Sequence, residues 1–225
     1  MIKSIGIGRL AEKKIKILEE LKMRKQDNPS YKIIDVGGAK EKHCLDKFSF
    51  IDAYVDMRVI NDHRVKGFNG NINDPNLWEE IVNYVKINGK FDYCLCTHTL
   101  EDISSLLYVV SQICKISISG FLSFPSKYRE LSRFEPNLYR GYYHHRWIFI
   151  SKKDYLLALP KINIIEHIFF DTIAAKCNVD NYELYAEWND NINLKIINND
   201  WLGPNYEDCL DMYKKELLES NEDYL

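Results

Sequence analysis

The chain has 225 residues, of which 46% are hydrophobic and 28% are charged, and its formal net charge is -3. This composition excludes a disordered or low-complexity chain, because enough apolar side chains are present to build a buried core. The slightly acidic balance also excludes a basic field over the whole domain, so we expect no nucleic-acid partner.

The six cysteines are spread along the chain without the C-x-x-C spacing of a zinc knuckle or a redox motif. We therefore interpret all six as reduced thiols and expect a cytoplasmic protein. The amino terminus lacks the apolar core of a signal peptide. The stretch 103–126 carries Lys115 as its only charge, but its serines, Gly120 and Pro125 favour a buried helix and strand over a membrane span.

Residue periodicity in the first half predicts helices that alternate with short strands. Asp74 and Pro75 suit the start of one of these helices, as a cap and a first-turn residue. The alternation predicts right-handed β-α-β crossovers and a parallel sheet. The predicted helices cover 11–25, 74–85 and 99–114, and the predicted strands cover 31–36, 52–56, 65–68, 91–96 and 120–124.

The pattern changes after Pro125. Apolar runs there are separated by turn signals, which predicts antiparallel edge strands in the last third of the chain. The predicted strands cover 146–151, 162–170, 182–188 and 194–197, a short helix covers 153–159, and an amphipathic helix covers 206–218.

The strongest motif is the apolar run that leads through Asp35 into Gly37 and Gly38. Paired glycines after a buried strand let the backbone approach a ligand closely at the carboxyl end of a parallel sheet. Asp56 ends the next predicted strand, about 20 residues further on, where nucleotide-binding sheets place an acid for the ribose hydroxyls. Together these features indicate a nucleotide-type site.

A second glycine pattern, at residues 6–11, fits the G-x-G-x-x-A fingerprint of dinucleotide-binding folds. Only five residues precede Gly6, so the strand that this fingerprint requires is barely accommodated. We therefore interpret the segment as a flexible lead into the first helix. An NAD(P)-dependent oxidoreductase that uses Gly6 and Gly8 is the alternative enzyme.

Four segments between residues 31 and 124 resemble, in order, the motifs of class I S-adenosylmethionine-dependent methyltransferases. Residues 35–39 resemble the glycine loop under the amino-acid end of the cofactor, and Asp56 stands at the position of the ribose-binding acid. Residues 70–72 resemble a Gly-Asp-Ile segment that contacts adenine, with Asn71 in place of the acid. Residues 91–102 resemble the fourth motif, in which a strand ends below the reacting sulfonium.

The resemblance implies a Rossmann-like methyltransferase fold of class α/β, with a mostly parallel seven-stranded sheet, helices on both faces and antiparallel C-terminal strands. It implies a single domain with an N-terminal helical lead (1–30), a cofactor-binding half (31–125) and an acceptor-side half (126–225). The implied cofactor is S-adenosyl-L-methionine, and its product is S-adenosyl-L-homocysteine. The residues expected to contact it are Asp35, Gly37, Gly38, Ala39, Asp56, Met57, Asn71, Ile72, Thr97 and His98.

The implied reaction is an in-line methyl transfer, in which positioning of donor and acceptor supplies roughly 7–11 kcal/mol. A hydroxyl acceptor must also lose a proton, and histidine suits this task near neutral pH. We expect the base among three histidines. His98 lies just past the fourth predicted strand of the first half, and His144 and His145 follow the fifth.

The segment 139–147 combines hydrogen-bonding groups with aromatic faces, which suits a polar, ring-shaped acceptor such as a sugar. The residues expected to bind the acceptor are Lys127, Arg129, Tyr143, Arg146 and Trp147. No metal is assigned. Glu101 and Asp102 either solvate the start of a helix or bind a divalent ion together with His98.

We therefore expect an O-methyltransferase that acts on a small polar acceptor, most concretely a sugar hydroxyl in glycan biosynthesis. Residues 122–126 and 144–147 also resemble small methyltransferases attached to glycan-building enzymes, some in large DNA viruses, which suggests a part of a larger enzyme. The alternative outside enzymes is a binding module that kept the fold and lost turnover. Residues 97–100 lack the motif of amino-directed base methylation, which argues against a nucleic-acid substrate.

Overall fold

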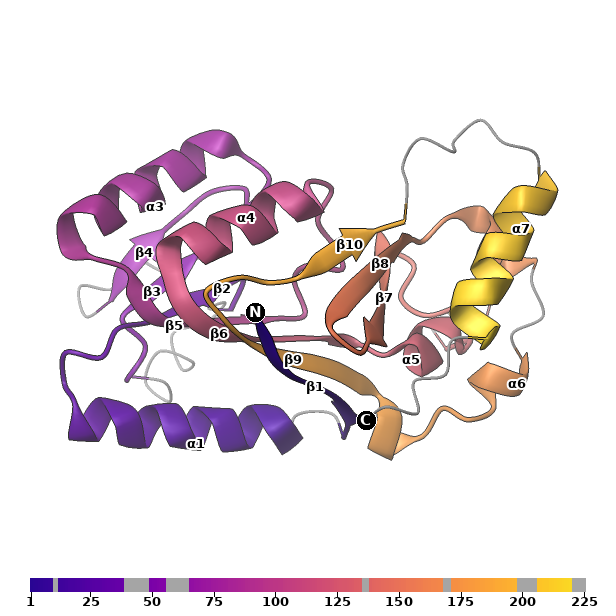
Figure 1. The fold of residues 1–225 in the computed structure, drawn as a ribbon, viewed down its shortest axis with the longest axis horizontal. Helices are drawn as coiled ribbons and strands as arrows, with labels where there is room; N and C mark the ends of the chain where they lie inside the picture. Colours follow the sequence, from indigo (N-terminus) through magenta and orange to yellow (C-terminus); the bar gives the residue numbers. More distant parts are fainter. Residues whose placement is uncertain are drawn as a thin grey trace.

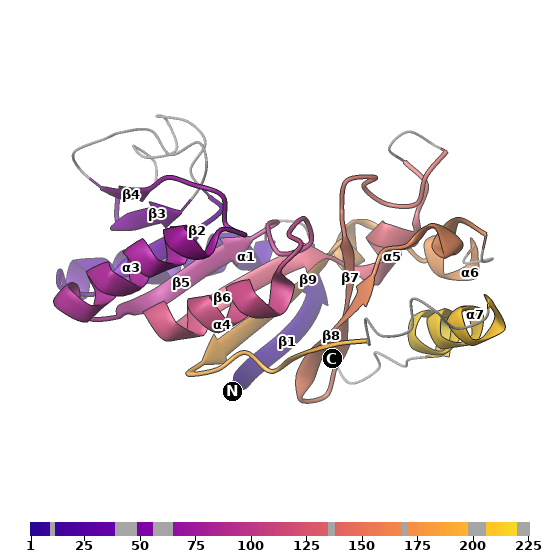
Figure 2. The same ribbon diagram turned by 90° about the horizontal axis from the view of Figure 1, so that it is seen from above.

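The protein is built on two β-sheets with helices packed around them (Figures 1 and 2). A computed structural model describes residues 1–9, 12–38, 49–55, 65–134, 138–167, 171–197 and 206–219. The large sheet has seven strands in the order β1-β9-β6-β5-β2-β3-β4, and the small sheet has three strands in the order β10-β8-β7.

In the large sheet, β9 runs antiparallel between β6 and β1, and the other strands are parallel to one another. The chain adds β3 and β4 on one side of β2 and then returns to add β5 and β6 on the other side. The order thus reverses between β2 and β5, which places a topological switch point at their carboxyl ends. The predicted Rossmann-like methyltransferase fold is confirmed. The strands are β1 (Ile2–Gly8), β2 (Ile33–Val36), β3 (Ala53–Val55), β4 (Lys66–Phe68), β5 (Phe91–Thr97), β6 (Ser117–Pro125) and β9 (Glu183–Asn189).

The N-terminal segment forms the strand β1, so the interpretation of residues 6–11 as a flexible lead is wrong for residues 6–8, whereas residues 10 and 11 lie outside the described part of the chain. β1 pairs with β9 from Ile2 through Gly8. A Cβ atom at Gly6 would lie 2.2 Å from the hydroxyl oxygen of Tyr185 on β9. Gly6 thus makes room for a neighbouring side chain, and the sheet pairing that the sequence pattern did not reveal comes from a strand far along the chain.

Helices cover both faces of the large sheet (Figure 2). The helix α1 (Glu12–Asp27) lies on one face, where Ile17 and Leu21 pack against strand residues such as Ile33, Tyr93 and Phe121. The helices α3 (Pro75–Asn88) and α4 (Leu106–Ile116) lie on the other face and join a cluster that reaches into the small sheet. Full burial of one large aliphatic side chain contributes about 1.5–3 kcal/mol, so these two clusters hold the helices in place.

The helix α3 begins where the sequence predicts. The side chain of Asp74 accepts a hydrogen bond of 2.9 Å from the backbone N–H of Asn76, and Pro75 stands in the first turn. Gly89 ends the helix with a φ of 78°, a left-handed conformation that glycine adopts without steric cost.

The helix α4 begins at Leu106 and not at residue 99, which corrects the predicted start. The side-chain oxygen of Asn73 accepts hydrogen bonds from the backbone N–H groups of Ser104 and Ser105, at 3.1 and 3.0 Å. These bonds satisfy amide groups just before the helix, which would otherwise lack partners. Residues 99–105 form turns at the switch point and not the first part of the helix. The candidate residues Glu101 and Asp102 lie in these turns.

The small sheet contains β7 (Trp147–Lys152), β8 (Tyr155–Pro160) and β10 (Leu194–Ile196). The strands β7 and β8 form an antiparallel hairpin, and β10 is parallel to β8. The predicted helix at 153–159 is therefore wrong. Leu156 belongs to the core of the large sheet, whereas Leu157 packs into a separate cluster on the far side. Both faces of β8 are buried, so its apolar run lacks the alternation that marks a half-exposed strand.

Short helices surround the small sheet on its outer side (Figure 1). The predicted strand at 162–170 is wrong over its described part, which contains a 3-10 turn at Asn163–Glu166. The predicted C-terminal helix is confirmed as α7 with its continuation η4. The helices around the small sheet are η1 (Asn163–Glu166), α5 (Lys127–Leu131), α6 (Asp171–Ala174), α7 (Tyr206–Lys214) and η4 (Lys215–Glu219), whereas η2 (Val179–Asn181) contacts β1 of the large sheet.

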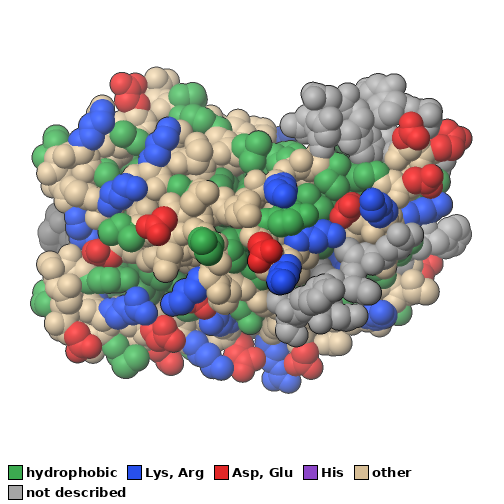
Figure 3. Space-filling view, viewed as in Figure 1, with side chains coloured by type: hydrophobic (Ala, Val, Ile, Leu, Met, Phe, Trp, Pro, Cys, Tyr) green, Lys and Arg blue, Asp and Glu red, His purple; other side chains and the backbone are tan. Residues whose placement is uncertain are grey.

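The expected helix and strand within 103–126 are confirmed as α4 and β6. Within the described ranges, no helix is long and apolar enough to cross a membrane. On the face shown in Figure 3, basic and acidic side chains of the described residues are interspersed and do not gather into one large basic surface.

We predict that Gly120→Ala destabilises the fold. A Cβ atom at this position of β6 would lie 2.3 Å from the carbonyl oxygen of Cys94 on β5, which is backbone and cannot move aside. Overpacking of this kind costs about 1–3 kcal/mol. Urea unfolding should show this loss, whereas Gly8→Ala, whose Cβ would meet Tyr185 at 3.5 Å, should change the free energy of unfolding by less than about 0.5 kcal/mol. Equal stability of the two variants would contradict the packing described for β6.

Candidate functional site

The candidate site lies at the switch point, where Gly37 directly follows the end of β2. This residue has a φ of 91°, and its N–H donates a 2.7 Å hydrogen bond to the carbonyl oxygen of Val55 at the end of β3. A Cβ atom on Gly37 would lie 2.2 Å from the Thr99 hydroxyl oxygen. The backbone of the β2 turn therefore contacts the β5 turn directly, and only glycine fits between them.

Asp35 and Gly38 form the second close contact of this turn. Asp35 is buried within β2, and a Cβ atom on Gly38 would lie 2.0 Å from its carboxylate. The turn thus presents half-buried backbone with a carboxylate packed behind it. Ala39, Asp56 and Met57, which were also expected to bind the cofactor, lie outside the described residues.

Asn71 and Ile72, expected to contact adenine, lie in the loop between β4 and α3. The side-chain oxygen of Asn71 accepts a 2.9 Å hydrogen bond from the backbone N–H of Asn73. The carbonyl oxygen of Ile72 accepts from the indole nitrogen of Trp78 at 2.7 Å. These bonds fix the loop beside the turn that precedes α4, because Asn73 also contacts that turn.

Thr97 ends β5 and is buried. Its hydroxyl oxygen accepts a 2.7 Å hydrogen bond from the ammonium group of Lys14 on α1. This contact brings a positive charge to the carboxyl edge of the sheet, at the position where the fourth motif ends.

His98 follows Thr97 and stands between two buried carboxylates. Its Nδ1 lies 3.3 Å from an oxygen of Glu101, and its Nε2 lies 2.9 Å from an oxygen of Glu183 at the start of β9. Burial disfavours the imidazolium, but the hydrogen bonds to Glu101 and Glu183 outweigh this effect and raise the pKa of His98 to about 10. Burial raises the pKa of Glu101, and His98 opposes that increase. At neutral pH His98 is therefore a cation that donates hydrogen bonds, which does not fit a general base.

The carbonyl oxygen of Glu101 joins the β5 turn to the segment before β7. It accepts hydrogen bonds from the backbone N–H groups of Arg146 and Trp147, at 2.6 and 3.2 Å. The indole nitrogen of Trp147 also donates to the carbonyl oxygen of Ile103 at 2.7 Å. The structure thereby brings together the two sequence segments that carry the candidate histidines.

His144 and His145 both face Asp102, which follows Glu101 in the same turn. Their Nε2 atoms lie 3.8 Å (His144) and 3.6 Å (His145) from an oxygen of Asp102. Glu101 instead faces His98, so the predicted alternative grouping of Glu101, Asp102 and His98 around an ion is not the arrangement observed.

A buried chain of polar groups stands behind His145. The Nδ1 of His145 lies 2.6 Å from one oxygen of Glu130, and the ammonium group of Lys161 lies 2.7 Å from the other. Lys161 also donates to the carbonyl oxygen of Tyr142 at 2.6 Å. Since a carboxylate only accepts hydrogen bonds, Nδ1 of His145 carries the proton and Nε2 is left to face Asp102.

The five residues expected to bind the acceptor occupy different environments. Lys127 is buried, and the guanidinium of Arg129 stacks 3.4 Å above the ring of Phe134. Trp147 is buried in the core, so its ring offers no open face to a ligand. Tyr143 is 69% exposed, and Arg146 is also exposed.

Two cavities are lined in part by candidate histidines. One of about 570 Å³ is lined by side chains that include Tyr139, Tyr143, His145 and Lys161. Another of about 170 Å³ includes His98 in its lining. The first has a size typical of small-molecule sites.

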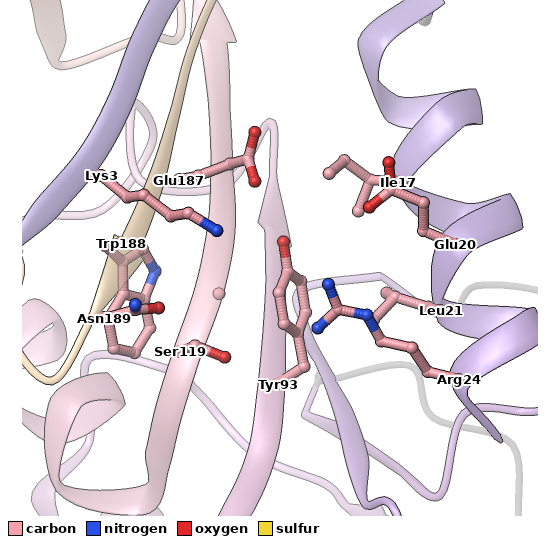
Figure 4. Close-up of a pocket in the computed structure, with 11 residues that line it drawn as sticks. Lys3, Ile17, Glu20, Leu21, Arg24, Tyr93, Ser119, Glu187, Trp188 and Asn189 are labelled. Atoms are coloured by element: carbon pink, nitrogen blue, oxygen red, sulfur yellow. The ribbon is translucent and has the colours of Figure 1, made fainter. Parts of the chain in front are cut away.

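A third pocket lies at the opposite, amino-terminal end of the parallel strands and is shown in Figure 4. Its lining includes Tyr93 of β5 with Arg24 of α1 beside the ring, and Glu187 of β9. Its volume of about 40 Å³ suffices for one or two water molecules and no more.

Sequence reasoning missed Glu130, Lys161 and Glu183. The one local signal that could have identified Glu130 is its position next to Lys127 and Arg129, because an acidic residue follows two basic residues that were expected to bind the acceptor. Lys161 directly follows β8 and Glu183 begins β9, and the pairing of these strands with β7 and β6 brings the two residues to the histidines.

The sequence matches no protein-family model and no curated protein sequence. Its fold is similar to that of the N-terminal domain of EvdMO1 with SAH bound, at 9% identity and a TM-score of 0.37, over 76% of this chain and 80% of that chain. It is also similar to a SAM-dependent methyltransferase from Anabaena variabilis, at 7% identity and a TM-score of 0.41, over 82% and 87% of the two chains. A third similar structure is the methyltransferase domain of bacterial CtHen1, at 12% identity and a TM-score of 0.38, over 77% and 97%.

These similarities concern the fold alone and assign no function to any residue of the candidate site. The strand order of this chain, with β9 antiparallel between β6 and β1, defines the Rossmann-like methyltransferase fold by itself. The switch point between β2 and β5 is the position where such sheets bind their ligands.

We predict that the charge on His98 stabilises the folded state in a pH-dependent way. The pKa of His98 is about 10 in the folded protein and about 6.5 in an unfolded chain. The stabilisation is therefore complete below about pH 6.5 and is lost as pH rises through about 10. As pH rises from 7 to 10, the melting temperature of His98→Asn should fall less steeply than that of the unchanged protein. Asparagine suits this position because residue 98 has a φ of 50°. Parallel melting curves over this range would show that His98 is not a cation stabilised by the fold.

Proposed function

We propose that this chain is a class I S-adenosylmethionine-dependent O-methyltransferase that acts on a sugar hydroxyl. The observation that carries the proposal is the convergence of two features at one sheet edge. The glycine turn after β2 contacts the turn after β5, and that second turn is bonded to the segment with His144 and His145. A cofactor and an acceptor bound at these two places would be neighbours.

The residues of the β2 turn fit the cofactor. Gly37 and Gly38 present backbone without side chains, and Asp35 offers a carboxylate beside them. Asp56 is the proposed partner of the ribose hydroxyls, and Asn71 and Ile72 are proposed to lie against the adenine. When bound, the cofactor supplies a methyl group on a positively charged sulfur.

The chain's own residues would orient the acceptor and manage its proton. His98 is protonated at neutral pH, so it would donate a hydrogen bond to a ligand or hold Glu101 and Glu183 in place. This leaves His144 and His145 to organise the loss of the acceptor proton, with Asp102 between them. Positioning of the two reactants supplies the larger share of the rate, about 7–11 kcal/mol.

The cavity of about 570 Å³ is the proposed place of the acceptor. Tyr139 and Tyr143 are 49% and 69% exposed at its wall, and Lys161 lines it as well. Aromatic faces beside hydrogen-bonding groups suit a sugar ring, because its C–H face stacks on an aromatic ring while its hydroxyls reach polar atoms. We also propose that the methylated sugar belongs to a glycan or to a precursor in glycan biosynthesis.

We predict that Asp56→Ala weakens binding of S-adenosyl-L-homocysteine by about 10- to 100-fold. The change removes charge-assisted hydrogen bonds, which contribute about 1.5–3 kcal/mol. Isothermal titration calorimetry measures the affinity, and Asp27→Ala at the exposed end of α1 is the matched control with unchanged binding expected. If the unchanged protein binds no S-adenosyl-L-homocysteine, the proposed function is wrong.

We predict that His144→Ala lowers methyl transfer by about 10²- to 10⁴-fold, since loss of proton management has this magnitude. His144 is exposed, so the variant should keep its melting temperature. A labelled-methyl assay with a panel of sugar acceptors measures the rate, and Lys86→Ala, at an exposed position of α3, is the control. Full activity of His144→Ala would contradict the role proposed for this histidine. Cofactor binding without transfer to any acceptor would instead favour a binding module.

A further inference from the structure

Three side chains with metal-binding atoms meet beside the proposed acceptor cavity. They are Asp102 from the turn after β5, and His144 and His145 from the segment before β7. One ligand atom from each lies within 4.8 Å of the others. His145 also lines the cavity of about 570 Å³, so one of the three residues stands at the wall of that cavity.

The spacing of these atoms suits a shared ion better than direct hydrogen bonds. The Nε2 atoms of His144 and His145 lie 3.8 and 3.6 Å from Asp102 Oδ1, beyond the usual range of a hydrogen bond. Metal bonds of 2.0–2.2 Å place neighbouring ligand atoms roughly 3.0–3.5 Å apart. His144 is exposed, so its side chain has room to rotate toward this geometry.

The orientation of His145 is a second, independent observation. Its Nδ1 donates to Glu130, which is itself paired with Lys161, and all three side chains are buried. Histidine ligands of metals almost always donate their second ring N–H to a carboxylate or carbonyl in this way, which aims the other nitrogen at the ion. Here that other nitrogen, Nε2, faces Asp102.

Backbone contacts hold the ligands in register before any ion binds. The N–H groups of Arg146 and Trp147 donate to the carbonyl oxygen of Glu101, which directly precedes Asp102. The indole of Trp147 is fixed to Ile103 on the other side of Asp102. Asp102 and His145 are therefore each one residue away from a rigid backbone junction.

We propose that Asp102, His144 and His145 bind one divalent transition-metal ion, with its remaining positions open toward the cavity. Two imidazoles and one carboxylate favour ions such as Zn²⁺, Co²⁺ or Fe²⁺ over Mg²⁺ and Ca²⁺, which prefer oxygen ligands. The binding of the ion is inferred from the contacts of these residues and does not depend on the proposed function.

The role of the ion rests on the proposed function. A hydroxyl of the acceptor that coordinates the ion becomes more acidic, and its proton passes to solvent. The resulting oxygen forms a bond to the methyl carbon, and the electron pair of the broken S–C bond stays on the sulfur, which becomes neutral. His144 and His145 then act by holding the ion.

The test uses the full chain without a purification tag, stripped with a chelator and titrated with Co²⁺. Visible absorption and calorimetry should show one ion per chain, and Zn²⁺ should displace it whereas Mg²⁺ in large excess should not. His144→Ala and Asp102→Asn should each weaken Co²⁺ binding by at least 10-fold, and the control His167→Ala should leave it unchanged. Glu130→Gln should weaken binding by about 10- to 100-fold, the range for loss of a carboxylate behind a ligating histidine.

The outcome separates this inference from the proposed function. Unaltered Co²⁺ binding in His144→Ala, with an unchanged melting temperature, would overturn the metal site, as would equal affinity for Mg²⁺ and Zn²⁺. Calorimetry with S-adenosyl-L-homocysteine on the same stripped samples reports on the cofactor site alone. Cofactor binding without Co²⁺ binding therefore refutes the metal site only, whereas Co²⁺ binding without cofactor binding refutes the methyltransferase and leaves the metal site standing.

Discussion

One backbone acceptor, the carbonyl oxygen of Glu101, is the contact on which the candidate site depends. It lies in the turn after β5 of the large sheet and accepts from the N–H groups of Arg146 and Trp147, where β7 of the small sheet begins. The two sheets meet there, and so do the two segments with the titratable side chains. Because only main-chain atoms form these bonds, the bonds do not depend on the side chains of the three residues that they join.

Two buried charge networks flank this junction, and their composition differs. In the first, His98 lies between the carboxylates of Glu101 and Glu183, so a positive imidazolium is needed to offset them. In the second, Glu130 has two partners, because one of its oxygens faces the ammonium group of Lys161 and the other faces Nδ1 of His145. Buried charges are costly unless they are paired, and the two networks pair their carboxylates differently: Glu101 and Glu183 with His98, and Glu130 with both Lys161 and His145.

The sequence alone predicted the parts of the fold that local patterns determine. The apolar runs of β2, β5 and β6, the glycines after β2 and the Asp74 cap all have short-range causes and were found. The strands β1 and β8 were missed, because β1 is paired only through β9, and β8 is apolar on both faces. For the site, sequence reasoning found the histidines and Asp102 but could not find Glu183 or Lys161, whose positions are set by strand pairing.

The pairing of β1 with β9 has a consequence for how the molecule forms. Ile2 stands opposite Trp188, so β1 acquires its neighbour in the sheet only after β9, which follows most of the other strands in the chain, is present. Contacts between residues so far apart in sequence are slow to form, because the intervening chain must first lose its conformational entropy. Until β9 arrives, one border of β6 remains open, and an open border of this kind is prone to pair with another chain. The last step of sheet assembly thus decides between correct pairing within the chain and aggregation.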